Sequence, residues 1–231
     1  MSEVRLRPII DGDVGWMSEI RNKPENLEHC RNPRMISFRA QENWWKKFQK
    51  DWNQDLLVIE RKSHISTSSG TNEWTRIGVG GVTHIEWLNH CGEMSLLMEF
   101  PQNTEWALEG LKLLTDYGHN VLNLHRLWVE CYTDDRTELF QSGGFRVEGR
   151  KIQAVWRDGK YTNSVLLSRI HMDEVDEAVK AAYESGAVKE DKEFGPVVKR
   201  LEETQRKSAK SLSAVSRTVE KIEDAFVPEA A

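Results

Sequence analysis

Two glutamates, Glu93 and Glu99, stand at the two ends of a short apolar run and could take part in proton transfer. The run between them reads MSLLM and predicts a strand. A spacing of six residues places both carboxylates on the same face of such a strand. Each can serve as a general base if burial raises its pKa toward neutrality. The alternative for each is a strand-end carboxylate in solvent, and the residues alone leave that choice open.

A regular series of predicted elements surrounds these glutamates. Before them, the apolar patterns predict an edge strand, two helices and two strands, over residues 4–8, 13–21, 40–50, 55–60 and 76–87. After them, the stretch from Trp106 to Gly149 predicts a long helix, a strand and a short helix. A hairpin with Asp158-Gly159 at its turn closes the series. We therefore expect one α/β (α+β) domain over residues 1–170.

The stretch after the long helix carries a family likeness. It contains Asn123-Leu124-His125-Arg126, a strand over 127–133, then Gly144-Phe145 and Glu148-Gly149. In these residues and in its order of elements, the chain resembles the GNAT superfamily of acyl-CoA-dependent N-acyltransferases, specifically the branch of ribosomal-protein-alanine N-acetyltransferases. The resemblance implies a GNAT fold, with a mixed central sheet in which two parallel strands splay apart.

Acetyl-CoA is the cosubstrate that the resemblance implies. Its pantetheine arm would lie between the splayed strands, here 93–100 and 127–133, along Leu97, Met98 and Glu99. Its pyrophosphate would bind at the start of the long helix, because free backbone N–H groups there attract anions. The matching loop consists of Gln102, Asn103, Thr104, Glu105, Trp106 and Ala107.

Glu105 departs from the family pattern, which has glycine at that position. A carboxylate about 4 Å from a phosphate charge adds repulsion of about 1–4 kcal/mol, depending on the effective dielectric constant. Two arrangements would relieve it: the register of the loop shifts, or Glu105 points outward as an acid in the first helical turn.

Two further departures follow downstream. Phe140 replaces a tyrosine that often protonates the leaving thiolate in the family, and Asp135 replaces an asparagine that commonly contacts the cofactor. Phenylalanine cannot donate a proton, so the thiolate would leave without that acid. The resemblance also implies that a carboxylate on the splayed strand takes a proton from the incoming amine, which is the role open to Glu93 or Glu99.

Composition excludes several other classes of protein. A net charge of -5 provides no basic field for nucleic acid. No apolar run approaches the roughly 18 residues needed to cross a bilayer, and Met1-Ser2-Glu3 does not begin a signal peptide, so we expect a cytoplasmic protein. Three scattered cysteines argue against disulfides, and His84, His90 and Cys91 lack the spacing of a metal site.

The composition changes after His171. Residues 171–196 predict a charged helix and a linker, and residues 197–231 contain a heptad pattern. Its seam positions alternate spacings of three and four from Val198 to Phe226, weakened by Gln205 and Ser208. This pattern predicts a coiled-coil extension that joins copies of the chain or binds a partner protein through 197–226. The alternative is a helix that packs on its own domain.

The resemblance to the GNAT superfamily implies an acyl-CoA-dependent N-acyltransferase that moves an acetyl group to a primary amine of a protein or a small molecule. The fold alone does not choose the acceptor. The competing hypothesis is a catalytically degenerate GNAT-fold binding or assembly module that works through its C-terminal helix. Glu105 and Phe140 favour this second interpretation.

Overall fold

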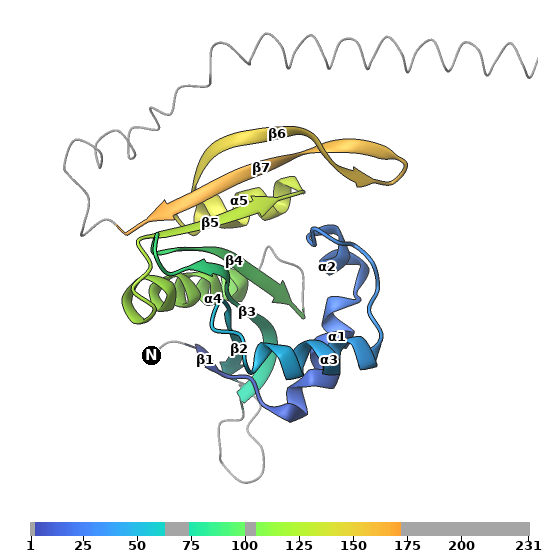
Figure 1. Ribbon diagram of the computed structural model, residues 1–231, viewed down its shortest axis with the longest axis vertical. Coiled ribbons are helices and arrows are strands. Elements are labelled where there is room, and N and C mark those ends of the chain that lie inside the picture. Colours follow the sequence, from blue (N-terminus) through green and yellow to red (C-terminus); the bar gives the residue numbers. More distant parts are fainter. Residues whose placement is uncertain (1–2, 63–73, 100–104, 172–231) are drawn as a thin grey trace, which may run out of the picture. The chain divides into compact units, whose positions relative to one another are not determined.

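A computed structural model describes residues 3–62, 74–99 and 105–171 of the 231-residue chain (Figure 1). Within them, seven strands form one mixed sheet in the order β1-β2-β3-β4-β5-β7-β6. The strands are β1 (Val4–Pro8), β2 (Asp55–Lys62), β3 (Trp74–Glu86), β4 (Cys91–Met98), β5 (Arg126–Cys131), β6 (Arg146–Arg157) and β7 (Lys160–Ile170). Two C-terminal segments were expected, 171–196 and 197–231. Apart from residue 171, both lie outside the described residues.

Five α-helices accompany the sheet in the described residues: α1 (Val14–Arg21), α2 (Pro24–Glu28), α3 (Phe38–Phe48), α4 (Glu105–Asp116) and α5 (Asp134–Ser142). The predicted α/β fold class and order of elements are confirmed, with the short helix α2 as an addition. The long helix ends earlier than expected, because a π-helical turn over Tyr117–Val121 follows α4. Arg126, expected to close that helix, instead begins β5 and pairs with Glu148.

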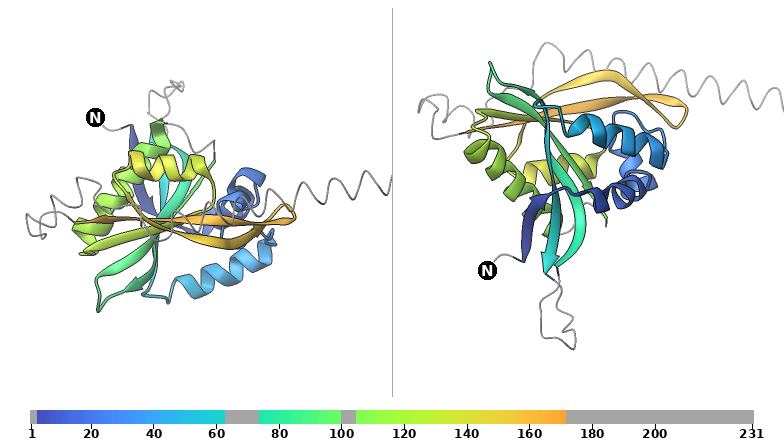
Figure 2. Two further views of the ribbon diagram at one scale, coloured as in Figure 1. Left: turned by 90° about the horizontal axis from the view of Figure 1, so that it is seen from above. Right: turned by 60° about the horizontal axis from the view of Figure 1, so that its bottom comes forward.

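Helices cover the sheet from both sides (Figure 2). On one side, α4 and α5 pack on a large core that includes Leu111, Phe140 and the strand residue Leu96. On the other side, α1 and α3 pack on a smaller core around Ile20 and Val58. Because β4 lies between these layers, its apolar side chains can be buried in either direction.

The hairpin at the end of the described chain forms as the sequence predicted. Asp158 and Gly159 both have positive φ, 47° and 76°, as a two-residue turn of type I′ requires. They join β6 to β7, and the second half of β7, from Val165 to Ile170, pairs with the whole of β5. The hairpin therefore extends the sheet beyond β5.

β4 and β5 pair in parallel at only three positions, from Cys91 with Arg126 to Glu93 with Trp128. Beyond Glu93 the two strands diverge, as the arrows in Figure 1 show. β4 continues to Met98 and β5 to Cys131 without pairing with each other. We call this diverging segment the fork; it corresponds to the splayed strand pair that the family resemblance implies.

Candidate active site

The fork contains a cavity of about 320 Å³. Its walls come from β4 and β5, from the first turn of α5 and from the segment that follows α2. The lining includes six polar or charged side chains that matter below: Arg31, His84, Glu93, Glu130, Tyr132 and Arg136. Cavities of this size with a few convergent polar groups are typical of small-molecule sites.

Glu93 lies where the pairing of β4 and β5 ends. Its side chain is 15 % exposed. Arg31 Nη2 lies 3.0 Å from its Oε1, and His84 Nδ1 lies 2.9 Å from its Oε2. Burial raises the pKa of Glu93, and Glu130 adds to that effect, while Arg31 and His84 oppose it; the net pKa lies above that of an ordinary glutamate. Glu93 can therefore accept a proton at a higher pH than a surface carboxylate.

An irregularity in β3 directs His84 toward Glu93. The register of β3 with β4 shifts between Thr83 and Glu86, and His84 has a φ of 50° there. Bulges of this kind re-aim side chains and are common beside active sites. The His84 side chain is 69 % exposed, so it connects the carboxylate of Glu93 with solvent.

Glu130 on β5 is a second carboxylate in the fork, and its pKa shifts in the direction opposite to that of Glu93. It accepts hydrogen bonds from Ser164 Oγ at 2.5 Å, from Lys151 Nζ at 2.9 Å and from Arg31 Nη2 at 3.3 Å. Burial opposes its ionisation, but these donors together hold its pKa below the ordinary value. Glu130 thus keeps its negative charge where Glu93 can lose its own.

Arg31 links the two carboxylates. Besides contacting Glu93 and Glu130, it donates a hydrogen bond from Nε to the Tyr132 hydroxyl at 3.2 Å. Its side chain is about half exposed and comes from an irregular segment after α2. A guanidinium between two carboxylates marks a position in the fork that is suited to a cation.

Two side chains donate hydrogen bonds to carbonyl groups of β4 that face the fork. Arg136 Nη2 donates to the Leu96 carbonyl at 2.7 Å, and Asn26 Nδ2 donates to the Met98 carbonyl at 2.9 Å. These carbonyls lie beyond the last pair of β4 with β5, so β5 does not satisfy them. The edge of β4 at the fork is therefore able to accept hydrogen bonds from amide donors.

Glu99 shares the strand face of Glu93 but lies outside the cavity lining. Just past the end of β4, it accepts a hydrogen bond from Trp16 Nε1 at 2.6 Å and pairs with Lys23 Nζ at 2.5 Å. Both partners belong to α1 and the turn after it. The two expected bases thus have different surroundings: Glu93 faces the cavity, and Glu99 ties β4 to the helical layer.

The residues expected along the pantetheine arm and at the pyrophosphate have different surroundings in the structure. Leu97 lines the cavity, whereas Met98 is buried in the large core. At the start of α4, Glu105 is exposed in the first turn, which corresponds to the outward arrangement. Trp106 stacks under the Arg61 guanidinium at 4.2 Å, and Ala107 is fully buried. The remaining loop positions, Gln102, Asn103 and Thr104, lie outside the described residues.

Asp135 and Phe140 on α5 have different environments. Asp135 lies in the first turn, with Oδ2 3.6 Å from His29 Nε2. Burial and, after it, the charge of Arg136 lower the pKa of His29 to about 4, against the opposing effect of Asp135. Phe140 is fully buried and packs edge-to-face on Phe145 at 5.1 Å, in the core rather than in the cavity lining.

No pattern in the sequence predicts a site role for Arg31, Glu130, Tyr132 or Arg136, and His84 stands out in the sequence only as a metal ligand that its spacing disfavours. Glu130 and Tyr132 are two residues apart at the end of a predicted strand, so their alternation could have indicated a shared face. Arg136 precedes Phe140 by four residues on α5, a spacing that places both on one helix face. Arg31 in an irregular segment and His84 at a bulge had no comparable signal.

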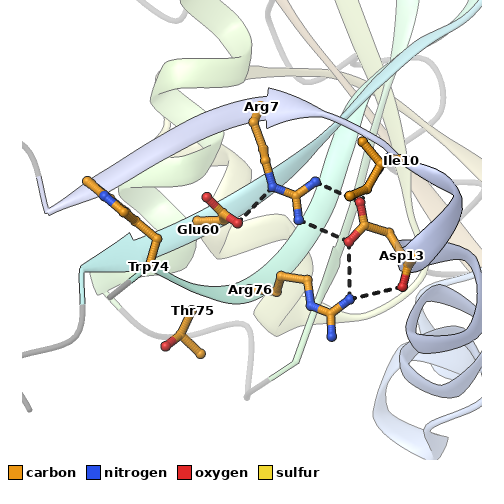
Figure 3. Close-up of a pocket in the computed structure, with 8 residues that line it drawn as sticks. Arg7, Ile10, Asp13, Glu60, Trp74, Thr75 and Arg76 are labelled. Carbon is orange, nitrogen blue, oxygen red and sulfur yellow. Dashed lines mark hydrogen bonds and ion pairs between the residues drawn. The ribbon is translucent and has the colours of Figure 1, made fainter. Parts of the chain in front are cut away.

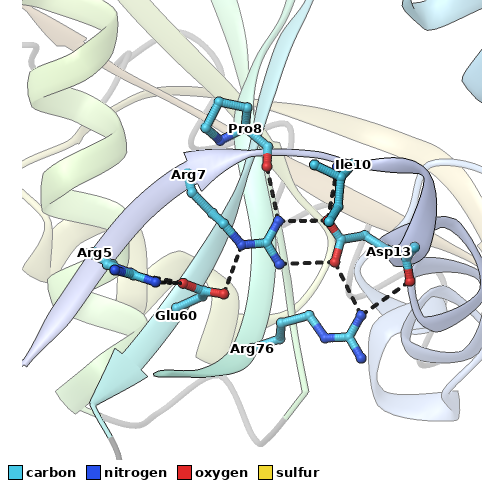
Figure 4. A network of polar contacts seen from close by, with 8 residues as sticks. Arg5, Arg7, Pro8, Ile10, Asp13, Glu60 and Arg76 are labelled. Atoms are coloured by element: carbon cyan, nitrogen blue, oxygen red, sulfur yellow. Dashed lines mark hydrogen bonds and ion pairs between the residues drawn. The ribbon is translucent and has the colours of Figure 1, made fainter. Parts of the chain in front are cut away.

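A second cluster of charges lies at the other end of the sheet, beside a cavity of about 390 Å³ (Figure 3). Arg7 pairs with Asp13 at 2.6 Å and with Glu60 at 2.7 Å. Arg76 also pairs with Asp13, and Arg5 with Glu60, so the ion pairs form one chain (Figure 4). Each carboxylate here has at least two arginine partners.

Two other features bear on the class of protein. Among the described residues, no group of three His, Cys, Asp or Glu side chains could hold a metal ion. None of the helices in those same ranges has the length and apolarity to cross a lipid bilayer.

Comparisons with known proteins point to one kind of relative. No protein-family model matches the chain. Spermidine N(1)-acetyltransferase of Escherichia coli K12 is 22% identical over 166 residues, 70% of this chain and 83% of that protein. The structure of spermidine N-acetyltransferase from Vibrio cholerae with CoA and spermine superposes with a TM-score of 0.63, at 19% identity, over 74% of this chain and 96% of that one. A dodecameric structure of the Vibrio enzyme gives 0.59, at 18% identity, over 77% and 99%.

The matched relatives are N-acetyltransferases, and each match covers 70% or more of this chain. They are spermidine acetyltransferases, so the narrower likeness to the ribosomal-protein-alanine branch stays a prediction. The fork, the order of the sheet and these similarities together identify the chain as a protein of the GNAT fold.

Proposed function

We propose that this chain is an acyl-CoA-dependent N-acyltransferase that moves an acetyl group from acetyl-CoA to a primary amine of a cationic, polyamine-like acceptor. The observation that carries the proposal is the fork itself, with the proton-accepting Glu93 at the point where β4 and β5 separate. The sequence relationship with the Escherichia coli spermidine acetyltransferase supports it independently.

Acetyl-CoA would supply an acetyl group activated as a thioester. The fork fits its pantetheine arm chemically, because β4 has a strand edge that β5 does not pair with. The carbonyls of Leu96 and Met98 accept hydrogen bonds there from Arg136 and Asn26. Amide N–H groups of pantetheine would donate hydrogen bonds to these carbonyls in place of Arg136 and Asn26. The two side chains would then have to find other hydrogen-bond partners. Glu105 is exposed on the first turn of α4, and we expect the phosphates to bind at this helix N-terminus.

Glu93 is the general base in this proposal, and Glu99 has a structural role. Glu93 faces the cavity with a raised pKa, whereas Glu99 is held by Trp16 and Lys23 outside it. Glu93 would take the proton from the amine nitrogen. His84, at 2.9 Å and largely in solvent, would then receive that proton or pass it to water.

Glu130 would select the acceptor by charge. Its carboxylate stays ionised and lies within reach of Arg31, which also contacts Glu93. An acceptor with several ammonium groups can displace the half-exposed Arg31 and occupy the same position. The Vibrio cholerae relative binds spermine, an amine of this class.

Two measurements test the function. Acetyl-CoA should raise the melting temperature of the protein, because it binds the native state. The release of free thiol should then be followed with spermidine, spermine and an uncharged primary amine. No stabilisation by acetyl-CoA and no thiol release with any amine would reject the enzyme and leave the non-catalytic binding module.

The role of Glu130 has its own test. Glu130→Gln should raise KM for spermidine about tenfold or more, because it removes a buried charge partner, and should change KM for the uncharged amine much less. Glu138→Gln, an exposed carboxylate on α5, is the matched control. An equal loss with charged and uncharged amines would mean that Glu130 does not select by charge.

We further propose that the chain self-associates through the heptad segment 197–226. The dodecameric Vibrio cholerae relative supports assembly as a property of such enzymes. Light scattering of the full chain should report an oligomer, and truncation after His171 should reduce its size while the domain stays folded. A monomer in both cases, with loss of stability on truncation, would mean that the segment packs on its own domain.

A further inference from the structure

Arg136 presents a buried positive charge in the wall of the fork. It lies on α5, its residue is 5 % exposed, and its Nη2 donates to the Leu96 carbonyl of β4 at 2.7 Å. It lines the same cavity as Glu93. A charged side chain at such depth is costly to bury, and its electrostatic effect is strong because little water screens it.

The charge of Arg136 influences the pKa values of two cysteine thiols near the fork. Burial, the largest effect, raises the pKa of the Cys30 and Cys131 thiols, and the Arg136 guanidinium acts against that rise in both. Cys30 itself lines the cavity. The guanidinium therefore favours the thiolate form of thiols placed in this part of the molecule.

We propose that Arg136 is a catalytic residue that stabilises the thiolate released from acetyl-CoA in the fork. This inference rests on the proposed function. In the transfer, the C–N bond to the acceptor forms, and the proton of the acceptor nitrogen goes to Glu93. The C–S bond of the thioester breaks, and its electron pair goes to the sulfur beside the guanidinium.

The neighbourhood of Arg136 favours electrostatic stabilisation over proton donation. Its guanidinium lies 5.0 Å from the centre of the Phe140 ring, and that ring has no proton to give. A guanidinium keeps its protons at neutral pH, so Arg136 would act through its charge rather than as an acid. A cation beside the sulfur stabilises the negative charge that develops there, and this accelerates the cleavage of the C–S bond.

The test compares two ligands that differ only at sulfur, CoA and desulfo-CoA. Their affinities for the full-length protein are measured by calorimetry from about pH 6 to about pH 9, on either side of neutrality and into the range where thiols ionise. Other groups around the cavity also titrate or carry charge: His29, Cys30, Arg31, His84, Glu93, Glu130, Tyr132 and Asp135. The ratio of the two affinities at each pH cancels their contributions.

If Arg136 stabilises the thiolate and lowers the thiol pKa by about one unit on binding, the affinity ratio of CoA to desulfo-CoA should rise severalfold by about pH 9, toward a limit of about tenfold above the pKa of the free thiol. The ultraviolet absorbance of the bound thiolate should appear at correspondingly lower pH than for free CoA. Arg136→Gln keeps a donor for the Leu96 carbonyl but removes the charge, and should abolish the rise. Arg136→Lys should retain part of it, and Arg146→Gln, at an exposed arginine of β6, should leave it unchanged.

Each outcome has a distinct meaning. A ratio that does not change with pH in the unmodified protein would overturn the role of Arg136, even if Arg136→Gln failed to fold. A rise that survives in folded Arg136→Gln would overturn it too. If neither CoA nor desulfo-CoA binds, the proposed acyltransferase function itself fails.

Discussion

Carboxylates cluster with arginines at two places in the sheet, and one carboxylate of the fork, Glu93, differs from those at the other place in the direction of its pKa shift. At the β1 end, Asp13 and Glu60 share the arginines shown in Figure 4, and both pKa values lie below their ordinary values. In the fork, the pKa of Glu93 is raised. All three carboxylates are largely buried, so burial alone does not account for the difference.

The number and kind of donors separate the two regions. Asp13 accepts hydrogen bonds from two Arg7 nitrogens, from Arg76 and from the Ile10 backbone N–H, which outweigh burial and lower its pKa to about 2. Glu93 has Arg31 and His84, but it also has the like charge of Glu130 nearby. A carboxylate whose oxygens are all bonded to positively charged or N–H donors stays ionised and stabilises the fold. A carboxylate with fewer such donors and a like charge nearby can change its protonation state.

The largest expected effect is on stability at the β1 end. Asp13→Asn should lower the free energy of unfolding by about 3–5 kcal/mol, because it removes one of the two buried carboxylates that pair with Arg7 and also the buried partner of Arg76. Chemical denaturation at neutral pH measures this, with Glu19→Gln, an exposed acid on α1, as the control. A loss smaller than about 1 kcal/mol would show that Glu60 alone compensates Arg7.

The second effect is on turnover in the fork. Glu93→Gln should slow turnover about 10²-fold or more through loss of general-base catalysis, with little loss of stability. Glu99→Gln should change the rate much less, although it breaks the pair with Lys23. Thiol release with a saturating amine measures both. Unchanged turnover in Glu93→Gln would mean that the base lies elsewhere.

A third effect is the acid dependence of stability. Because the pKa of Asp13 is lowered to about 2, its ionisation stabilises the fold above the pKa of the unfolded chain, and this stability is lost as the pH falls. We expect a loss of about 2 kcal/mol from this residue between about pH 4 and about pH 2. Denaturation at several pH values measures the slope. Asp13→Asn should flatten it, and a slope equal to that of the unmodified protein would contradict the assignment.

The smallest effect concerns His84. His84 lowers the pKa of Glu93, so His84→Ala should raise it further and move the acid limb of the kcat/KM profile to higher pH, by less than about one unit. His90→Ala, at an exposed histidine with a similar backbone φ, is the matched control. An acid limb that stays in place or moves to lower pH would show that His84 does not lower the pKa of Glu93.

Local patterns in the sequence predicted much of this protein. The even spacing of Glu93 and Glu99 placed them on one strand face, and Asp158-Gly159 marked the last hairpin, because both depend on backbone geometry between neighbouring residues. The order of apolar segments predicted the fold class, and the resemblance to the GNAT superfamily implied the pair of diverging strands. The division into residues 1–170, 171–196 and 197–231 stays a prediction, since most of the later part lies outside the described residues.

Only the tertiary structure distinguished Glu93 from Glu99 and identified their partners. Arg31 meets Glu93 across 62 residues of sequence and Glu130 across 99. Periodicity describes which way a side chain points, but it carries no information on what a distant segment brings to the same place. The pKa of a carboxylate depends on that assembled environment, through burial and neighbouring charges. The sequence therefore determined where candidate bases could stand, and the packing of distant segments decided which of them faces a cavity with a raised pKa.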